Sequence, residues 1–502
     1  MGGEVLTAFH LLATWHNLVA IVAGVVIGII VGILPGLGPS AGVALLIPFT
    51  YKLHPTTSLV LLVALWVAAE YSGSVTGILI SVPGTPAAAA TVLDGFALNQ
   101  QGLVGKALGL SLTGAVFGGL FGALMLVLFT QPLARFALSF GPAEYCLLGV
   151  LGMTMVASLS GKNLLKGMVT ALLGLFLTTI GVDVVSGVPR FTFSRPELMD
   201  GIPLLPILLG LFAVSEAFQV IAGGEFAVSI KQKIYTTWLS WRELKQVSLA
   251  MVIGAIVGTI VGVLPGTGAG IGSWISYDMA KRASRQKEKF GHGAWEGVAA
   301  PEAANCAITG ASLLPLLAFA VPGSPTAAII LGAFMIHDLR PGPDLFNAAN
   351  APIVYSMYMG LILAIIVMFI FGMLVVPYLA RLVILPKDIL AVVIIILSLL
   401  GAYVGHNYLF DVWLALGFGV FGYLLRRTGF PLPPLVLGVV LGNMIEENLR
   451  RALLISDGSW IIFLASPAAI IMLILTVLSL FWAAGGAKLL RGNRIRQEGS
   501  NG

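Results

Sequence analysis

Two short motifs, each occurring twice in the chain, hold residue types that can stop a helix and bind an anion. The first is Pro-Gly-x-Gly, directly after an apolar run, at residues 35–38 and 265–268. Proline removes a backbone N–H donor, and glycine permits the conformations that end a helix. Unwound backbone at membrane depth is tolerated only where it is buried in protein or lines a polar cavity. Interruptions at matching positions in two apolar segments therefore predict a ligand site near the membrane midplane.

The second motif is Pro-Gly-Thr/Ser-Pro, at residues 83–86 and 322–325. Pro is favoured at the first helical position, and Ser or Thr is favoured as the capping residue just before it. Thr85 and Ser324 therefore each predict a new helix start. Helix starts carry free N–H groups and a partial positive charge, so they bind carboxylates without lysine. The four breaks contain no Lys or Arg. The predicted substrate-binding residues are Gly36, Gly38, Ser40, Pro83, Gly84, Thr85, Gly266, Thr267, Gly268, Pro322, Gly323 and Ser324.

Small polar residues gather just before the second motif in each case. Hydroxyls, amides and freed carbonyls are the groups that coordinate Na⁺ in transporter sites. The same residue types also serve close helix packing, and a lone Pro-Gly pair is usually a kink. The pairing of four breaks favours a binding site. The predicted cation-binding residues are Ser72, Ser74, Thr76, Asn305, Thr309 and Ser312.

Three acidic residues lie near these motifs: Glu70, Asp94 and Glu302. An ionisable group inside a membrane is costly, so it is a functional candidate. When residues 75–77 (Val-Thr-Gly) are aligned with residues 308–310 (Ile-Thr-Gly), Glu70 and Glu302 fall within one residue of equivalence. They could carry protons or hold the hydroxyl clusters in place, or they could sit at helix ends near water. Asp94 precedes a polar stretch and is interpreted as interfacial.

The elements that carry these residues must be membrane helices. Of the 502 residues, 58% are hydrophobic and only 10% are charged, whereas about a quarter of a soluble chain is charged. Apolar runs at residues 19–34, 103–129, 251–264, 355–379 and 460–482 carry almost no charge. We predict an all-α polytopic membrane protein with about 10–12 transmembrane helices plus re-entrant or broken helices.

An internal repeat relates the motifs. Residues 28–42 and 258–272 match at nine of fifteen positions, at a constant offset of 230. Residues 82–90 (VPGTPAAAA) resemble residues 321–329 (VPGSPTAAI). Two matched motifs in the same order predict a duplicated unit. Residues 1–235 would form the first transmembrane repeat, and residues 236–502 the second repeat with a basic cytoplasmic tail.

The charge pattern predicts that the two repeats are inverted. Residues 281–289 (KRASRQKEK) are strongly basic, which favours the cytoplasmic side, whereas their first-half counterpart at residues 51–54 has one lysine. Corresponding loops would then face opposite sides, as an inverted-topology repeat requires. The net charge of +5 forms no aromatic-interleaved basic stripe, so no nucleic-acid partner is expected.

Enzyme chemistry finds little support. A catalytic site needs a nucleophile with a base, or a metal cluster. The six histidines are scattered, and neither H-E-x-x-H nor a phosphate-binding G-x-x-x-x-G-K-[ST] occurs. Cys146 and Cys306 lie in apolar surroundings and are interpreted as small buried hydrophobes. We therefore expect no enzyme activity, no cofactor and no metal beyond a transported Na⁺. A channel stays open as a rival, because broken helices can line a pore.

Residues 32–42, 71–95, 262–272 and 302–343 resemble the large membrane subunit of tripartite tricarboxylate transporters. The resemblance implies a multi-pass protein of the bacterial inner membrane that works with a periplasmic substrate-binding protein and a small transmembrane subunit of about four helices. It implies uptake of citrate, other di- or tricarboxylates, or aromatic acids, driven by a Na⁺ or proton gradient and without ATP.

Residues and resemblance together give an expected mechanism. Two inverted halves would place the four breaks near the midplane, where N–H groups and hydroxyls bind the substrate carboxylates. A cation would offset the substrate charge while the site moves between membrane faces, by an elevator-like motion inferred from other carriers with paired hairpins. The alternative is an anion channel, or a permease that works without a binding protein.

Overall fold

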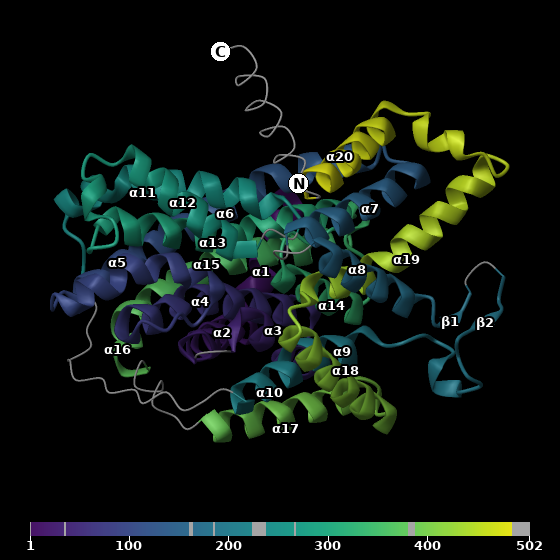
Figure 1. The fold of residues 1–502 in the computed structure, drawn as a ribbon, viewed down its shortest axis with the longest axis horizontal. Coiled ribbons are helices and arrows are strands. Elements are labelled where there is room, and N and C mark those ends of the chain that lie inside the picture. Colours follow the sequence, from purple (N-terminus) through teal and green to yellow (C-terminus); the bar gives the residue numbers. More distant parts are fainter. Residues whose placement is uncertain are drawn as a thin grey trace, which may run out of the picture. The chain divides into compact units, whose positions relative to one another are not determined.

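The computed structural model describes residues 2–34, 37–159, 164–183, 186–222, 237–265, 268–379 and 387–483. These residues are almost entirely helical, with one two-stranded antiparallel sheet among them (Figure 1). The sheet pairs β1 (Gly181–Val182) with β2 (Pro189–Arg190). The predicted all-α polytopic class is confirmed.

The helices of the first predicted half are α1 (Gly2–Leu12), α2 (Trp15–Ile33), α3 (Gly38–Thr50), α4 (Pro55–Ile80), the short η1 (Pro86–Ala88), α5 (Ala89–Gln100), α6 (Val104–Ala137), α7 (Pro142–Leu159), α8 (Leu164–Thr178), η2 (Pro196–Leu198), α9 (Leu204–Leu208), the π-helical η3 (Leu209–Val214) and α10 (Ser215–Ala222). Those of the second are α11 (Trp241–Val263), α12 (Gly268–Ala283), η4 (Lys287–Lys289), α13 (Trp295–Phe319), α14 (Pro325–Ile336), η5 (Pro343–Phe346), α15 (Ala351–Leu374), α16 (Val376–Leu379), α17 (Lys387–His406), α18 (Leu409–Arg427), α19 (Leu432–Ile455), η7 (Trp460–Leu464) and α20 (Pro467–Ala483).

Eight helical stretches among the described residues are long and apolar enough to cross a membrane. They are α2, α4, α6, the stretch from α9 to α10, α11, α13, α15 and α18. Six further apolar helices of 10–17 residues accompany them, including α3 and α14. Full-length spans are therefore fewer in the described part than the number of crossings expected, because several apolar segments fold as shorter helices beside a break.

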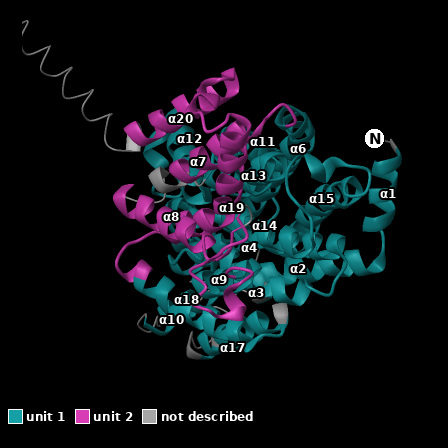
Figure 2. Cartoon of the chain, turned by 90° about the vertical axis from the view of Figure 1, so that its right-hand side faces the viewer, with its two compact units in different colours: residues 1–137, 203–424 teal, residues 138–202, 425–502 magenta. Residues whose placement is uncertain are grey.

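The chain forms two compact units (Figure 2). Unit 1 comprises residues 1–137 and 203–424, and unit 2 comprises residues 138–202 and 425–502. Each unit takes segments from both predicted repeats, so compact packing does not follow the division at residue 235. That division, and the inversion of the two halves, remain predictions about how the chain was duplicated.

Unit 2 holds the β-hairpin against α19 by a network of ion pairs. Arg190 contacts Glu446 at 2.7 Å and Asp183 at 3.2 Å, and Arg450 reaches Asp183 at 2.8 Å. The hydrogen bond to Glu446, together with the negative charges of Glu446 and Asp183, raises the pKa of Arg190. Glu446 and Arg450 therefore connect α19 to the β-hairpin.

In unit 1, α4 is a central helix, and 94% of its most apolar window is buried. Glycines of α2 let the two helices approach at backbone distance. A Cβ atom at Gly24 would lie 2.4 Å from the carbonyl oxygen of Leu61, and one at Gly28 would lie 2.3 Å from that of Leu65. Small residues at an interface permit this close approach, which larger ones prevent.

The pair α11 and α13 repeats the same packing. A Cβ atom at Gly254 would lie 2.2 Å from the carbonyl oxygen of Ala300, and one at Gly258 would lie 2.3 Å from that of Ala304. These glycines follow Gly24 and Gly28 by 230 positions, and the carbonyls follow those of Leu61 and Leu65 by 239. The repeat is therefore visible in the local packing, with its register fixed by glycine contacts.

This register corrects one sequence interpretation. At an offset of 239, the counterpart of Glu70 is Thr309, and the counterpart of Glu302 is Val63. The expected equivalence of Glu70 and Glu302 is wrong. It rested on a three-residue match that carries no packing constraint, whereas the glycine contacts determine how the helices align.

A third row of glycines brings α6 against α13. Cβ atoms at Gly114, Gly118 and Gly122 would lie 2.6, 1.9 and 2.3 Å from carbonyl oxygens of α13. The helix α13 therefore has α11 and α6 packed against it at backbone distance (Figure 1). Side chains that α13 presents to these neighbours are removed from water and lipid, which matters for Glu302.

Asp94 of α5 is fully buried, so its interpretation as an interfacial residue is wrong. Its Oδ1 accepts the backbone N–H groups of Gly291, Gly293 and Ala294 at 2.7–2.8 Å. The Tyr277 hydroxyl donates to Oδ2 at 2.8 Å. Burial, and then the charge of Asp94, raise the pKa of Tyr277. Asp94 thus anchors the loop before α13 to α5, across the two predicted halves.

Replacing Asp94 by Asn should destabilise the protein. The amide keeps one acceptor but loses the charge that four donors share, so we expect a loss of about 1–3 kcal/mol in the free energy of unfolding. Denaturant unfolding of the purified protein in detergent measures it. The control is Asp278→Asn, which removes an exposed pair with Arg282 on α12 and should cost no more than about 0.5 kcal/mol. Equal stability of the two variants would contradict the assignment.

Candidate functional site

The first motif interrupts the helices at both predicted positions. After α2 ends, Leu34 is extended, with φ −80° and ψ 111°, and after α11 ends, Leu264 has φ −79° and ψ 120°. The next helices begin at Gly38, with φ +57°, and at Gly268, with φ +64°. These left-handed values favour glycine. The predicted site residues Gly36, Gly266 and Thr267 lie outside the described residues.

The second motif forms a tight hairpin in each half. The helix α4 ends at Ser81, with φ +60°, and α13 ends at Ala320, with φ +59°. The N–H of Gly84 then donates to the carbonyl of Gly73 at 2.9 Å. In the same way, the N–H of Gly323 donates to that of Ser312 at 3.2 Å. Each chain segment therefore folds back on the helix that it has just left.

Both predicted helix caps are confirmed. The Thr85 hydroxyl accepts the N–H of Ala88 at 3.3 Å, and the Ser324 hydroxyl accepts that of Ala327 at 3.1 Å. Pro86 and Pro325 occupy the first positions of η1 and α14, as the motif predicts. The remaining N–H groups of the first turn, together with the helix dipole, favour negative charge there.

The two kinds of break meet within each half. A Cβ atom at Gly84 would lie 2.3 Å from the carbonyl oxygen of Gly32, near the end of α2. A Cβ atom at Gly323 would lie 2.2 Å from that of Gly262, near the end of α11. Pro83 and Pro322 precede these glycines and keep the tips from continuing as helix. The hairpin tip therefore packs directly on the helix end that precedes the first break.

The breaks also meet across the halves. The contacts are crossed, in that the helix start after the first break of each half contacts the helix start after the second break of the other half. The hydroxyls of Ser40, at the start of α3, and Thr326, at the start of α14, lie 2.9 Å apart. A Cβ atom at Gly270, at the start of α12, would lie 3.6 Å from the carbonyl oxygen of Pro86. Helix starts therefore face each other in two pairs. Helix starts carry partial positive charge and free N–H groups, which favour an anion nearby.

The predicted cation-binding hydroxyls are all buried, and most already have partners. Ser72 donates to the carbonyl of Gly28 at 3.2 Å, and Thr76 donates to that of Gly73 at 3.2 Å. Ser312 donates to the carbonyl of Thr309 at 3.4 Å and accepts a hydrogen bond from Ser324. These bonds stabilise the helices and hairpins, as the packing interpretation of small polar residues anticipates.

The other three predicted cation ligands differ. Ser74 donates to the Glu302 carboxylate. The Asn305 amide donates to the carbonyl of Glu70 at 3.0 Å, but its own oxygen has no partner. The Thr309 hydroxyl also has none. Buried acceptors without partners are uncommon and mark places where a ligand or water completes the structure.

The two acidic candidates lie deep in unit 1. Glu302 is fully buried and Glu70 is 7% exposed, so neither sits at a helix end near water. Glu70 accepts the indole N–H of Trp66 at 3.1 Å. Glu302 accepts the hydroxyl of Thr91 at 2.6 Å, in addition to that of Ser74. Among the described residues, the ion pairs of Lys and Arg involve other acids.

Sequence reasoning missed three polar residues that the structure brings to these places: Thr91, Ser111 and Thr326. Thr326 is the only hydroxyl residue of α14, whereas α6 also carries Thr113 and Thr130. A hydroxyl residue in a membrane helix is a weak signal, because it can also bond within its own helix. Only the packing of α5, α6 and α14 reveals their partners.

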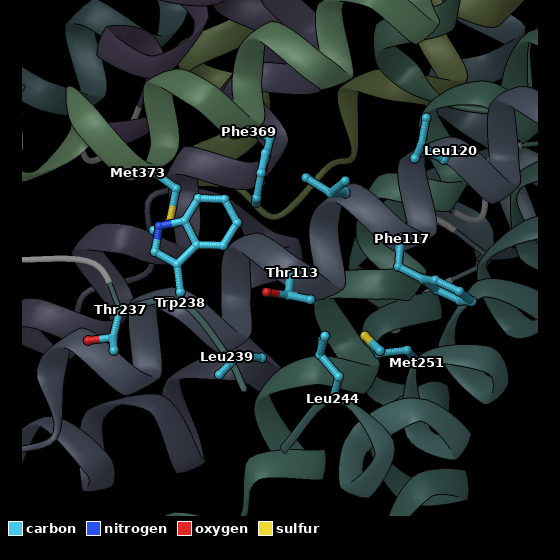
Figure 3. Close-up of a pocket in the computed structure, with 11 residues that line it drawn as sticks. Thr113, Phe117, Leu120, Thr237, Trp238, Leu239, Leu244, Met251, Phe369 and Met373 are labelled. Carbon is cyan, nitrogen blue, oxygen red and sulfur yellow. The ribbon is translucent and has the colours of Figure 1, made fainter. Parts of the chain in front are cut away.

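A pocket of about 300 Å³ lies elsewhere, between α6, α11, α15 and residues 237–239 (Figure 3). Its lining is almost wholly apolar and includes Phe117, Trp238 and Phe369. The hydroxyl of Thr113 in this lining already donates to the carbonyl of Gly109. Such a surface cannot orient an anion, so the helix breaks remain the candidate site.

Comparison with known proteins agrees with the sequence resemblance. A family model described as "Tripartite tricarboxylate transporter TctA family" matches residues 18–437. An uncharacterized 52.8 kDa protein in the TAR-I ttuC' 3' region of Agrobacterium vitis is 38% identical over 466 residues, which cover 92% of each chain. An uncharacterized protein in the TAR-II ttuC' 3' region of the same organism is 39% identical over 201 residues, covering 39% of this chain and 81% of that protein. No solved structure matches the chain.

Alanine at the hairpin tips should destabilise the site. In Gly84→Ala and Gly323→Ala the new methyl group meets backbone carbonyl oxygens that cannot rotate away, so we expect each variant to lose about 1–3 kcal/mol of stability. Thermal unfolding in detergent measures it. The control is Gly417→Ala in α18, where a Cβ atom meets nothing within 4 Å. If Gly84→Ala and Gly323→Ala unfold at the same temperature as the wild type, the tips are not packed as described.

Proposed function

Because the chain belongs to the tripartite tricarboxylate transporter TctA family, whose members are the large membrane subunits of these carriers, we propose that it takes up carboxylate anions by secondary active transport. The substrate class is citrate or other tri- and dicarboxylates. The gradient of Na⁺ or protons drives the uptake, and the protein is not an enzyme.

The crossed pairs of helix starts carry this proposal. The hydrogen bond between Ser40 and Thr326 joins α3 to α14, and the contact of Gly270 with Pro86 joins α12 to η1. A citrate or dicarboxylate has two or more carboxylates, so it can present one to each pair of helix starts. Backbone N–H groups and hydroxyls bind such groups without a permanent positive charge.

The absence of Lys and Arg from the four breaks suits a carrier. A lysine or arginine in the site would hold a carboxylate as a permanent ion pair, and the buried charge would be costly once the substrate left. A site of helix starts has no net charge of its own. A co-transported cation can then offset the substrate charge while the site is closed to both faces, and it leaves with the substrate.

The family implies partner subunits and a binding protein. We propose that the partners are a small transmembrane subunit of about four helices and a periplasmic substrate-binding protein, and that the complex lies in the bacterial inner membrane. The basic loop at residues 281–289 would face the cytoplasm. The paired hairpins suit an elevator-like movement of the site, an inference by analogy with other carriers.

Uptake of labelled citrate into proteoliposomes tests the proposal. The vesicles contain this chain and the small subunit, with the binding protein outside, and an imposed Na⁺ gradient is compared with a proton gradient. We expect accumulation above the external concentration under one gradient, with loss of uptake when the binding protein is omitted. Downhill flux that is insensitive to both gradients would instead support the channel alternative.

A matched pair of variants links that uptake to the hairpin. Ser324→Ala removes the hydroxyl that caps α14 and that, in the proposed site, donates to a substrate carboxylate. We therefore expect citrate uptake at low concentration to fall by about tenfold, the effect of losing one hydrogen bond to a charged group. Ser398→Ala removes a buried hydroxyl of α17 that donates to Ile394 within its helix, and it should transport like the wild type. Equal citrate uptake by Ser324→Ala and Ser398→Ala would show that the substrate does not bind at the hairpin.

A further inference from the structure

Four helices converge on the carboxylate of Glu302 in α13. Ser74 of α4 and Thr91 of α5 donate hydrogen bonds to its Oε1, the latter at 2.6 Å. The hydroxyl of Ser111 in α6 lies near the same carboxylate, outside the geometry of a hydrogen bond. All four side chains are fully buried. A carboxylate enclosed by three hydroxyls from three other helices forms a compact set of oxygen atoms inside the protein.

Two oxygens of this set lack a partner. Glu302 Oε2 and Ser111 Oγ are buried atoms with no hydrogen bond. An ionised carboxylate can only accept, so Oε2 needs a donor or a cation. A buried, unpartnered charge is among the costliest features that a protein can hold. A Cβ atom at Gly114 would lie 3.1 Å from the Cβ atom of Glu302, so α6 packs directly against the base of this side chain.

Within the described residues, no basic side chain forms an ion pair with this carboxylate. The ion pairs found among the described residues do not include Glu302 or Glu70. Asn305, one turn after Glu302, donates to the backbone of Glu70, which brings the second buried acid close to the first. In their ionised form these two acids would place uncompensated negative charge among membrane helices, where compensation is most needed.

We propose that Glu302, Ser74, Thr91 and Ser111 form a binding site for one Na⁺ ion. One carboxylate balances one monovalent charge, and hydroxyl oxygens complete the shell. A divalent cation such as Ca²⁺ takes about 6–8 oxygens, usually with several carboxylates. No group of three or more acidic, histidine or cysteine side chains that could hold such an ion occurs in the described part of the chain. A protonated Glu302 would instead donate from Oε2 to the hydroxyl of Ser111, and a Na⁺ titration distinguishes that state from a bound cation.

The site connects both hairpins. Ser74 and Thr91 lie on the two arms of the first hairpin, and Glu302 lies on the first arm of the second. A cation bound here joins α4, α5 and α13, whose ends carry the substrate-binding tips. Its role in coupling rests on the proposed function, but the binding of Na⁺ to the purified chain does not.

Thermal unfolding of the purified full chain tests the site directly. The protein is titrated with NaCl at constant ionic strength, with choline chloride as the balancing salt and without substrate. We expect Na⁺ to raise the melting temperature in a saturable way, because a ligand bound to the folded state stabilises it. Absence of a Na⁺ effect on the wild type would overturn the proposal.

Variants assign the ligands. Glu302→Gln keeps an acceptor for Ser74 and Thr91 but removes the charge, so we expect Na⁺ affinity to fall by more than about 100-fold. Ser111→Ala should weaken it by about tenfold, and it tests the site independently if Glu302→Gln fails to fold. The control is Thr130→Val on α6, whose buried hydroxyl donates to Leu126 within its helix. Wild-type Na⁺ affinity in Glu302→Gln or in Ser111→Ala would overturn the assignment.

These measurements distinguish a bound Na⁺ ion from a bound proton. Together with the uptake assay, they also distinguish failure of the Na⁺ site from failure of the proposed transport function. If Glu302 holds a proton, the wild type will be insensitive to Na⁺ and as stable in choline as Glu302→Gln, which contradicts the inference. Na⁺-driven citrate uptake that persists in Glu302→Gln would also contradict it while leaving the carrier function intact. Na⁺ binding without any citrate uptake would sustain the site and contradict the proposed function instead.

Discussion

Every backbone polar group inside a membrane must find a partner within the protein, and the breaks in these helices depend on how that requirement is met. Glycine meets it by allowing one backbone to approach another. Gly84 and Gly323 bring the hairpin tips within reach of the carbonyls of Gly32 and Gly262, and each tip also bonds to the helix that precedes it. The interrupted backbone is thereby enclosed, while the starts of the following helices keep N–H groups for a ligand.

In the proposed mechanism, two places in unit 1 bind ligands of opposite charge. Facing helix starts would supply partial positive charge for an anion, and the carboxylate of Glu302 would supply negative charge for a cation. Neither place uses a lysine or an arginine. The helix α13 carries Glu302 and ends at Phe319, shortly before the hairpin tip at Gly323, so this one helix would connect a cation and an anion bound at the two proposed places. The charge of the bound cation would then balance the charge of the bound anion, with α13 connecting the two.

The sequence predicted what local chemistry determines. Run lengths indicated membrane helices, and the caps at Thr85 and Ser324 followed from the motif itself. What it could not give depends on contacts between distant segments. Thr91 and Ser111 acquire their role only when α5 and α6 pack on α13, and the three N–H donors to Asp94 come from a loop about 200 residues away. The misaligned pair Glu70 and Glu302 shows that a three-residue match is weaker than a row of glycine contacts.

Cysteine modification tests most directly whether a carboxylate substrate binds between the crossed helix starts, because a bound substrate would shield cysteines placed there. Cysteines placed singly at Ser40 and at Gly270 would be alkylated with a polar maleimide, after replacement of the two buried native cysteines. We expect citrate to slow alkylation at both positions, and an uncharged polyol of similar size to slow neither. Equal rates with and without citrate at both positions, in protein that still transports it, would contradict the account.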